Sequence, residues 1–267
     1  MAELLRRSLS PITAEGWKEI DETTAEVLRT QLTARSLIDF DGPHGWEYAA
    51  VNLGRLDTAT SPGPEGVPWG QRKVLPLLEL RIPCVLSQME LDLIPRGCAD
   101  VDLEPLREAA LKLAKAEEAI VYQGFEEAGI AGIVRSSEHA PLPLSEPGDY
   151  PAAVARAVEL LHRAGIPGPY ALVLGFDRFA ALKQAGAEGY PPERIIREQL
   201  GGRILASPAL EGGVVLSTAG GHFQFVAGQD ISVGYSSHDR DEVELYLTES
   251  FTFRVIEPKA AVVFSLE

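Results

Sequence analysis

The residues of this chain that could do chemistry are scattered, and their spacing does not match the common motifs of hydrolases or of phosphate-binding loops. A serine hydrolase needs Gly-x-Ser-x-Gly so that the serine sits on a sharp turn. The nearest string here, Gly234-Tyr235-Ser236-Ser237, lacks the second glycine. The sequence also contains no Gly-x4-Gly-Lys-Ser/Thr or Gly-x-Gly-x-x-Gly string to hold phosphate groups. These observations favour a structural or binding role over catalysis, and we predict no catalytic residue.

Metal-binding patterns are missing as well. The five histidines lack the i, i+4 pairing of a zinc-binding helix; they are His44, His139, His162, His222 and His238. The acidic pairs Glu90-Leu91-Asp92 and Glu117-Glu118 lack the Glu-x-x-His spacing of a ferritin-like iron site. We interpret each acidic pair as a solvated face or a salt bridge between subunits, and we predict no metal and no cofactor.

The two cysteines, Cys84 and Cys98, have no second cysteine or histidine at metal-ligand spacing. We interpret them as buried, reduced thiols, since a single possible pair does not make a disulfide framework.

The overall charge argues against several classes of partner. The chain has 24 Lys and Arg against 39 Asp and Glu, a formal net charge of −15, whereas binding to nucleic acid requires clustered cations. The composition, 45% hydrophobic and 24% charged, is typical of a folded protein. No apolar stretch is long enough to span a membrane, and residues 1–10 lack a signal sequence. We therefore expect a cytoplasmic protein that binds neither nucleic acid nor membranes.

Periodicity predicts two helices and a hairpin in the first half. Apolar residues at helical spacing predict an amphipathic helix over 13–33 and a long helix over 102–128. Residues 46–56 and 72–86 suit strands, and the Pro- and Gly-rich segment 61–68 separates them. Such a hairpin projects outward, either as an ordinary surface loop or as a surface for other subunits.

The second half changes from mixed elements to strands. Between 134 and 202, short helices alternate with an apolar strand. From Arg203 onward, helical signals vanish and strands are predicted at 213–217, 223–227, 229–235, 243–250, 251–256 and 260–266. The chain is therefore predicted to be an α+β protein with a helix-rich insert.

A series of short strings in fixed order runs from end to end of the chain. They include Trp17-x-Glu19-Ile20-Asp21, Gly42-Pro43-x-Gly45-Trp46-Glu47-Tyr48, Trp69-Gly-x-Arg72-Lys73, Gly228-Gln229-Asp230 and Thr248-Glu249-Ser250-Phe251-Thr252-Phe253. Together they resemble the shell proteins of family 1 encapsulins. No single string is a catalytic signature, but their order across the whole chain is specific.

The resemblance implies the major-capsid fold of tailed phages, of the Hong Kong 97 type, with a peripheral domain, an axial domain and an extended loop. The implied division is an N-terminal helix with the start of the peripheral domain at 1–49, the extended loop at 50–81, the peripheral domain with its spine helix at 82–133, the axial domain at 134–221 and C-terminal strands of the peripheral domain at 222–267.

The function that the resemblance implies is that of a self-assembling shell rather than an enzyme. The expected shell is an icosahedral T=1 nanocompartment of sixty copies in the cytoplasm, closed by repeated contacts between subunits. It would enclose a cargo enzyme, either a dye-decolorising peroxidase or a ferritin-like iron-storage protein, and admit small solutes through pores.

One loop is implied to line the pore at the five-fold axis: Gln184, Ala185, Gly186, Ala187, Glu188, Gly189 and Tyr190. Its small residues would allow close approach of five copies, and a ring of Glu188 would favour cations over anions. The alternative is a plain surface turn.

The cargo would dock through a short C-terminal targeting peptide held in an apolar groove of the inner wall. Matching positions are Leu28, Leu32, Arg35, Ile38, Asp39, Ile231 and Val233. Arg35 or Asp39 would fix the register of the peptide, while the apolar side chains would supply area or simply pack helix on sheet. Some relatives carry a tryptophan associated with flavin before Glu90; this chain has Met89 there, so we do not predict flavin.

Two other functions remain as alternatives. The first is a prophage major head protein, which the acidic balance disfavours because its interior would face packed DNA. The second is a hydrolase, since similar sequences have been labelled as bacteriocins or proteases, although no nucleophile arrangement supports it.

Overall fold

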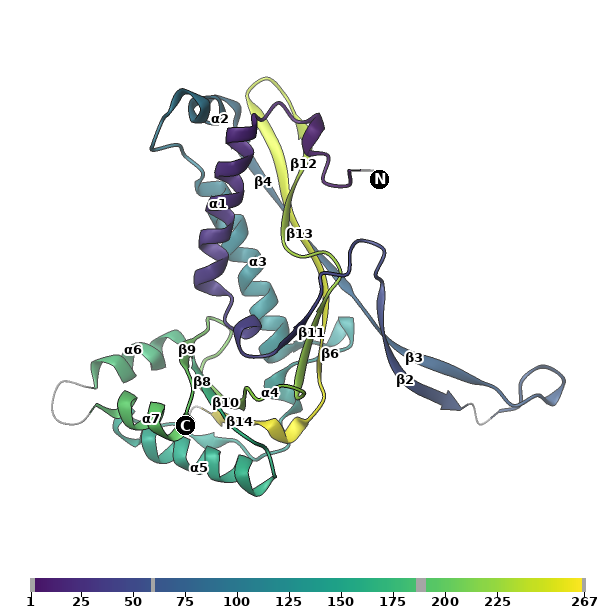
Figure 1. The fold of residues 1–267 in the computed structure, drawn as a ribbon, viewed down its shortest axis with the longest axis vertical. Helices are drawn as coiled ribbons and strands as arrows, with labels where there is room; N and C mark the ends of the chain where they lie inside the picture. Colours follow the sequence, from purple (N-terminus) through teal and green to yellow (C-terminus); the bar gives the residue numbers. More distant parts are fainter. Residues whose placement is uncertain (1–2, 59–60, 186–190, 266–267) are drawn as a thin grey trace.

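The computed structural model of this chain describes residues 3–58, 61–185 and 191–265. Two sheets lie at opposite ends of an elongated body, and a two-stranded hairpin projects away from its side (Figure 1). The N-terminal part of the chain lies with the first sheet, while the C-terminal end lies with the second (Figure 1). The architecture is mixed α and β, as the sequence predicts.

The first sheet is built around the long strand β13 (Glu242–Val255). One edge of β13 pairs antiparallel with β4 (Leu78–Ser87), and the other pairs with β11 (Phe223–Ala227) and β12 (Ser232–His238). Strand β1 (Asp39–Asp41) adds in parallel beside β11. The sequence predicted β13 as two shorter strands; it is one strand because β4 pairs with it across residues 242–251 on one edge, while β12 and then β11 pair with it on the other.

Helices α1 (Ala14–Gln31) and α3 (Glu104–Gln123) lie side by side along this sheet (Figure 1). The N–H of Gly16 donates to Thr13 Oγ1 at 3.1 Å, so Thr13 caps the N-terminus of α1. A short helix, α2 (Gln88–Leu93), follows β4. The helices bury an apolar core against the sheet that includes Ile20, Leu86, Leu106, Leu113, Val233, Leu245 and Leu247.

Helix α3 ends at Gln123, earlier than the expected end near residue 128. Gly124 has a φ of 89°, a conformation that turns the chain out of the helix. A side chain at Gly124 would place its Cβ 2.5 Å from the backbone nitrogen of Gly132. The chain uses this close approach to pair β5 (Gly124–Phe125) with β6 (Ile130–Ala131).

The second sheet has the order β7 (Leu142–Pro143), β14 (Ala261–Ser265), β10 (Gly213–Ser217), β8 (Tyr170–Leu174) and β9 (Ile204–Ala206). Every residue of β8 and β10 is buried, which explains why their sequences are continuous apolar runs. The helices of this part are α4 (Ile133–Ser136), α5 (Tyr150–Arg163), α6 (Phe176–Gln184) and α7 (Pro192–Leu200).

The last strand lies in a different sheet from the three strands before it. Strands β11, β12 and β13 lie in the first sheet. Strand β14 instead pairs with β10 and β7 in the second sheet. The physical reason lies in β10, which pairs with β8 on one edge only. Strand β14 pairs with its other edge, where the buried backbone groups of β10 would otherwise lack partners.

The predicted hairpin is confirmed and extends far from the body (Figure 1). Its strands are β2 (Ala50–Thr58) and β3 (Gly70–Pro76). The expected second arm is divided, because β4 starts after Leu77 and pairs with β13 rather than with β2. Several large apolar side chains on the hairpin and its tip are half exposed or more: Leu56, Val67, Trp69 and Val74. Within the described ranges, no helix is long and apolar enough to cross a bilayer.

Candidate functional site

A groove of about 390 Å³ lies between helix α1 and the loop that joins β11 to β12. Its lining residues are Ala25, Leu28, Arg29, Leu32, Arg35, Asp230 and Ile231. The helix wall arises because residues 25, 28 and 29 share one face of α1 and Leu32 follows directly at its C-terminal end. Larger hollows exist elsewhere, but their linings contain none of the residues predicted from the sequence.

The groove brings together four of the seven residues predicted to hold a peptide: Leu28, Leu32, Arg35 and Ile231. The three apolar members are half-buried, so part of each side chain is accessible from the groove. Hydrophobic side chains in this state can gain further burial from an apolar ligand.

The other three predicted residues lie outside the groove. Val233 is buried in the core between the first sheet and its helices, and Ile38 packs against the larger core. The Asp39 carboxylate on β1 accepts the N–H of Gly221 at 2.6 Å, which commits it to a neighbouring turn. The apolar positions were expected either to bind the peptide or to pack helix on sheet. Val233 and Ile38 pack within the chain.

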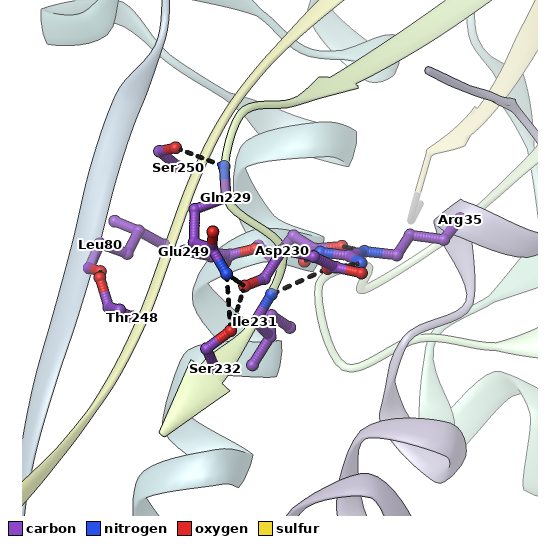
Figure 2. A network of polar contacts seen from close by, with 10 residues as sticks. Arg35, Leu80, Gln229, Asp230, Ile231, Ser232, Thr248, Glu249 and Ser250 are labelled. Carbon is purple, nitrogen blue, oxygen red and sulfur yellow. Dashed lines mark hydrogen bonds and ion pairs between the residues drawn. The ribbon is translucent and has the colours of Figure 1, made fainter. Parts of the chain in front are cut away.

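Arg35 lies at the base of the groove and binds three carboxylates. Its Nε and Nη2 donate to Glu117 Oε1 and Oε2 at 2.8 and 2.6 Å. Its Nη1 donates to Asp230 Oδ1 at 2.6 Å, and Nη2 also reaches Glu249 Oε2 at 3.0 Å. Arg35, Asp230 and Glu249 converge from separate segments of the chain (Figure 2). The cluster therefore connects the end of α1 with α3, with β13 and with the β11–β12 loop.

The cluster is mostly removed from water. The side chains of Glu117 and Glu249 are 0% and 1% exposed, whereas that of Asp230 is 43% exposed. The guanidinium of Arg35 also lies over the ring of Phe225, with Cζ 4.8 Å from the ring centroid. Burying the charged groups of this cluster costs desolvation energy. Close ion-pair geometry and hydrogen bonds offset that cost.

Burial and neighbouring charge shift the proton affinities of the cluster. Burial, with the negative charge of Glu117 added, raises the pKa of Glu249 well above its ordinary value. Burial alone would lower the pKa of Arg35, but its bonds to Glu117 outweigh this effect and raise that pKa instead. The folded chain therefore favours a proton on Glu249 and the charged form of Arg35.

Glu118, the next residue on α3, holds a second buried set of contacts. It accepts the N–H groups of Thr33 and Ala34, each at 2.8 Å, and the hydroxyl of Ser207 at 2.7 Å. The hydroxyl of Thr33 also donates to it at 2.5 Å. Burial raises the pKa of Glu118, although these hydrogen bonds oppose the shift. This carboxyl group thus fastens the end of α1 and the segment after β9 to the spine helix.

The interpretation of Glu117-Glu118 as a solvated face or an intersubunit salt bridge is wrong, because both side chains are 0% exposed. The missed signal was that Glu117 falls within the apolar stripe of the long helix. A carboxylate in such a stripe is stable only with a buried partner. Asp230 and Glu249 belong to sequence strings that support the family resemblance. The periodicity of the sequence did not predict that either would contact Arg35.

The β11–β12 loop that carries Asp230 is fixed by its own hydrogen bonds. The Gln229 N–H donates to Ser250 Oγ at 2.8 Å, and the Gln229 side-chain amide donates to Ser232 Oγ at 2.8 Å. Ser232 Oγ in turn donates to the Asp230 carbonyl at 2.8 Å (Figure 2). These bonds hold the loop wall of the groove in one shape.

The predicted pore loop is described only at its start. Gln184 ends α6, and the Ala185 N–H donates to the carbonyl of Ala181 at 3.1 Å. The remaining predicted pore residues, Gly186, Ala187, Glu188, Gly189 and Tyr190, lie outside the described residues.

Among the residues that the structure describes, the other reactive side chains form no catalytic arrangement. Burial raises the pKa of the Cys84 thiol to about 11, which keeps it protonated, while Cys98 is half-buried rather than buried as expected. The Ser237 hydroxyl donates to Glu244 at 2.7 Å rather than to a histidine. In the parts of the chain that the structure describes, no group of three His, Cys, Asp or Glu could hold a metal ion.

Comparison with known proteins places this architecture in a family. A family profile described as "Encapsulating protein for peroxidase" matches residues 1–252. The chain is 40% identical over 265 residues to the type 1 encapsulin shell protein of Rhodospirillum rubrum, covering 97% of this chain and 95% of that protein. It is 38% identical over 259 residues to the corresponding protein of Rhodococcus erythropolis, covering 97% and 98%.

Solved structures show the same fold. A virus-like particle from Pyrococcus furiosus matches with a TM-score of 0.67 at 18% identity, covering 93% of this chain and 99% of that one. The capsid of the myovirus XM1 matches with a TM-score of 0.55 at 11% identity, covering 86% and 90%. The expected major-capsid fold of the Hong Kong 97 type is thereby confirmed. With the profile match and the full-length relatives, the chain belongs to the family of type 1 encapsulin shell proteins.

Proposed function

We propose that this chain is the self-assembling subunit of an encapsulin nanocompartment that encloses a cargo enzyme and admits small solutes and ions. The observation that carries the proposal is the projecting β2–β3 hairpin. Leu56 and Val67 are each 59% exposed, and Trp69 and Val74 are each 51% exposed. An isolated two-stranded hairpin with an apolar surface is marginal in water, so a neighbouring copy would cover it.

We further propose that the groove between α1 and the β11–β12 loop receives the C-terminal targeting peptide of the cargo. The support is that Leu28, Leu32 and Ile231 line it while each keeps part of its surface accessible. A peptide that covers these side chains gains roughly 25 cal/mol per Å² of apolar surface removed from water. The Arg35 cluster fixes the base of the groove, so the site is largely preformed.

The cargo that we favour is a peroxidase of the dye-decolorising class. The matching family is described as encapsulating a peroxidase, which supports this class over a ferritin-like iron-storage protein. We also propose that sixty copies form an icosahedral T=1 shell and that the loop from Gln184 to Tyr190 lines its five-fold pore. Both of these rest on the family resemblance.

Electron microscopy of the purified protein tests the assembly proposal. Uniform hollow particles are expected, whereas particles filled with DNA would support a prophage head protein and a monomer with peptidase activity would support a hydrolase. Mass spectrometry of proteins that copurify inside native shells would then identify the cargo.

The substitution Leu28→Asp tests the groove. It places a charge among the apolar side chains, so it should abolish cargo loading while shells still form, because Leu28 is half-buried and its replacement leaves the core intact. Glu22→Asp on the exposed side of the same helix is the matched control. Normal loading of the Leu28→Asp shells would contradict the assignment of the groove.

A further inference from the structure

We propose that Asp230 selects the peptide in this groove by charge, so that the groove takes an apolar peptide that also carries a basic side chain. Arg35 is then a positioning residue that holds Asp230 rather than a contact for the peptide. This inference rests on the proposed function of the groove and adds the chemical class of its ligand.

Asp230 has one oxygen occupied and one available. Its Oδ1 accepts Arg35 Nη1 at 2.6 Å and the N–H of Ile231 at 2.8 Å. No hydrogen bond from the described part of the chain reaches Oδ2. Its side chain is 43% exposed and lines the groove beside Ile231. A carboxylate in this position can accept a hydrogen bond from a ligand ammonium or guanidinium group without breaking its existing bonds.

Arg35 is poorly suited to contact the ligand itself. Its Nε, Nη1 and Nη2 all donate to carboxylates of the chain, and its side chain is 17% exposed. Asp39, the other residue expected to set the register, lies outside the groove lining and accepts the N–H of Gly221. Among the charged residues of the groove, Asp230 and Arg29 remain available to a peptide.

The charge balance of the cluster favours a cation. Three carboxyl groups, from Glu117, Asp230 and Glu249, surround the single guanidinium of Arg35. Burial and the charge of Glu117 raise the pKa of Glu249, so it can be neutral, yet two carboxylates still face one cation. The cluster then keeps an excess negative charge, and its accessible part is Asp230. A basic side chain of the peptide would complete the charge balance at a partly dehydrated site.

The loop holds Asp230 in place before any ligand arrives. The backbone of Gln229 pairs with Ser250, with the Ser250 N–H donating to the Gln229 carbonyl at 2.9 Å and the Gln229 N–H to Ser250 Oγ at 2.8 Å. Ser232 Oγ closes the turn from the other side at the Asp230 carbonyl (Figure 2). A carboxylate held this firmly loses little conformational entropy on binding, which is what charge selection requires.

On the opposite wall, Arg29 of α1 lines the groove. Within the described ranges it has no ion pair, so it would repel a basic side chain that approached the helix wall. The peptide is therefore expected to direct its basic side chain toward the β11–β12 loop. This asymmetry distinguishes selection by Asp230 from a general attraction of cations to an acidic protein.

The test uses shells of the full chain coexpressed with a fluorescent protein that ends in an eight-residue apolar probe peptide. One probe position at a time is lysine, glutamine or glutamate, and loading is the fluorescence that sediments with the shells. At one position, the lysine probe should load about tenfold better than the glutamate probe. Asp230→Asn should bring this ratio close to one, and Asp230→Arg should invert it. Glu22→Gln, the same charge change at an exposed site on α1, should leave the ratio unchanged.

A loading ratio that stays the same in Asp230→Asn and Asp230→Arg shells would overturn the inference. Arg35→Lys tests the positioning role, because it keeps the charge but removes the planar fork; it should lower the lysine-to-glutamate ratio while the glutamine probe still loads. An unchanged ratio in this variant would overturn that role. A different result would overturn the proposed function of the groove. If the groove does not bind the peptide, Leu28→Asp shells load the glutamine probe as well as wild-type shells do, whatever the Asp230 variants do to the lysine-to-glutamate ratio.

Discussion

Arg35 and Glu117 are joined by two parallel hydrogen bonds, Nε to Oε1 at 2.8 Å and Nη2 to Oε2 at 2.6 Å, although 82 positions separate them in the chain. This two-point pair fixes the segment after α1 to the C-terminal half of α3. The same segment leads into β1, so one buried pair sets both the base of the groove and the entry into the first sheet. The stability of the fold and the shape of the groove therefore depend on the same side chains.

Glu117→Gln should destabilise the folded chain strongly. The amide can accept only one of the two bonds and leaves the buried guanidinium of Arg35 without its main counter-charge, at a cost of about 3 kcal/mol. Thermal unfolding of the variant shells, compared with wild type in the same buffer, measures this effect. Glu26→Gln on α1 is the exposed control, since its ion pair with Arg107 lies at the surface. Equal melting temperatures for Glu117→Gln and wild type would contradict the role of this pair.

Glu249→Gln should stabilise the folded chain rather than destabilise it, by an amount that depends on pH. Burial, together with the charge of Glu117, raises the pKa of Glu249 above the ordinary 4.5 in the folded chain. The folded state therefore holds this proton more tightly than the unfolded state does. The resulting stabilisation is complete below pH 4.5 and is lost as pH rises through the raised value.

Glutamine resembles the protonated carboxyl group at every pH. The melting temperature of Glu249→Gln shells should therefore be close to wild type near pH 4.5 and exceed it increasingly at higher pH. Melting curves recorded from pH 5 to pH 9 test this. A difference between variant and wild type that is constant with pH would contradict the raised pKa of Glu249, because the folded and unfolded states would then bind the same number of protons.

Glu118→Ala should loosen the connection between the first sheet and the second. The substitution leaves the N–H groups of Thr33 and Ala34 and the hydroxyl of Ser207 without their acceptor, and all three belong to buried residues. A loss of about 3 kcal/mol is expected from these unsatisfied groups and the cavity. Hydrogen exchange should accelerate at Thr33 and Ala34 before it accelerates in the core of β8. Uniform exchange across the chain would argue against a local connection.

The elements with a regular period could be predicted from the sequence. The capped helix α1, the hairpin, and strands such as β10 and β11 follow from spacing and turn residues alone. The end of α3 could not, because the stop depends on the close approach of Gly124 to Gly132 from a later segment. Strand β14 could not be assigned to its sheet either, since pairing with β10 is decided by tertiary contacts rather than by local pattern.

The groove was predictable only in part for a related reason. Leu28, Leu32 and Ile231 were predicted from the family resemblance, and all three line one groove. Val233 is buried rather than accessible from the groove, because successive side chains of β12 point to opposite faces and that of Val233 points into the core. The partners of Arg35 come from three distant segments, so local sequence patterns cannot predict this network.

The apolar hairpin should be required for assembly and not for folding. Trp69→Ser combined with Val67→Ser removes apolar surface that the subunit itself leaves half exposed, so the subunit should keep its secondary structure. Shell formation, followed by electron microscopy and light scattering, should be lost or greatly reduced. Met89→Ser is a control of similar exposure on the body of the chain. Normal shells from the double variant would contradict a role of the hairpin in subunit contacts.

Reversing the charge of Glu188 should slow the entry of cations into assembled shells. Glu188 belongs to the loop that the family resemblance assigns to the five-fold pore, where each copy would contribute one carboxylate to a ring. A ring of lysines repels cations that the glutamate ring attracts, and field effects of this kind change encounter rates by about tenfold or more. Stopped-flow uptake of a luminescent trivalent cation by empty Glu188→Lys shells measures the rate. Glu22→Lys shells, with the same change of net charge on α1, should take up the cation at the wild-type rate, and equal rates for the two variants would remove Glu188 from the pore.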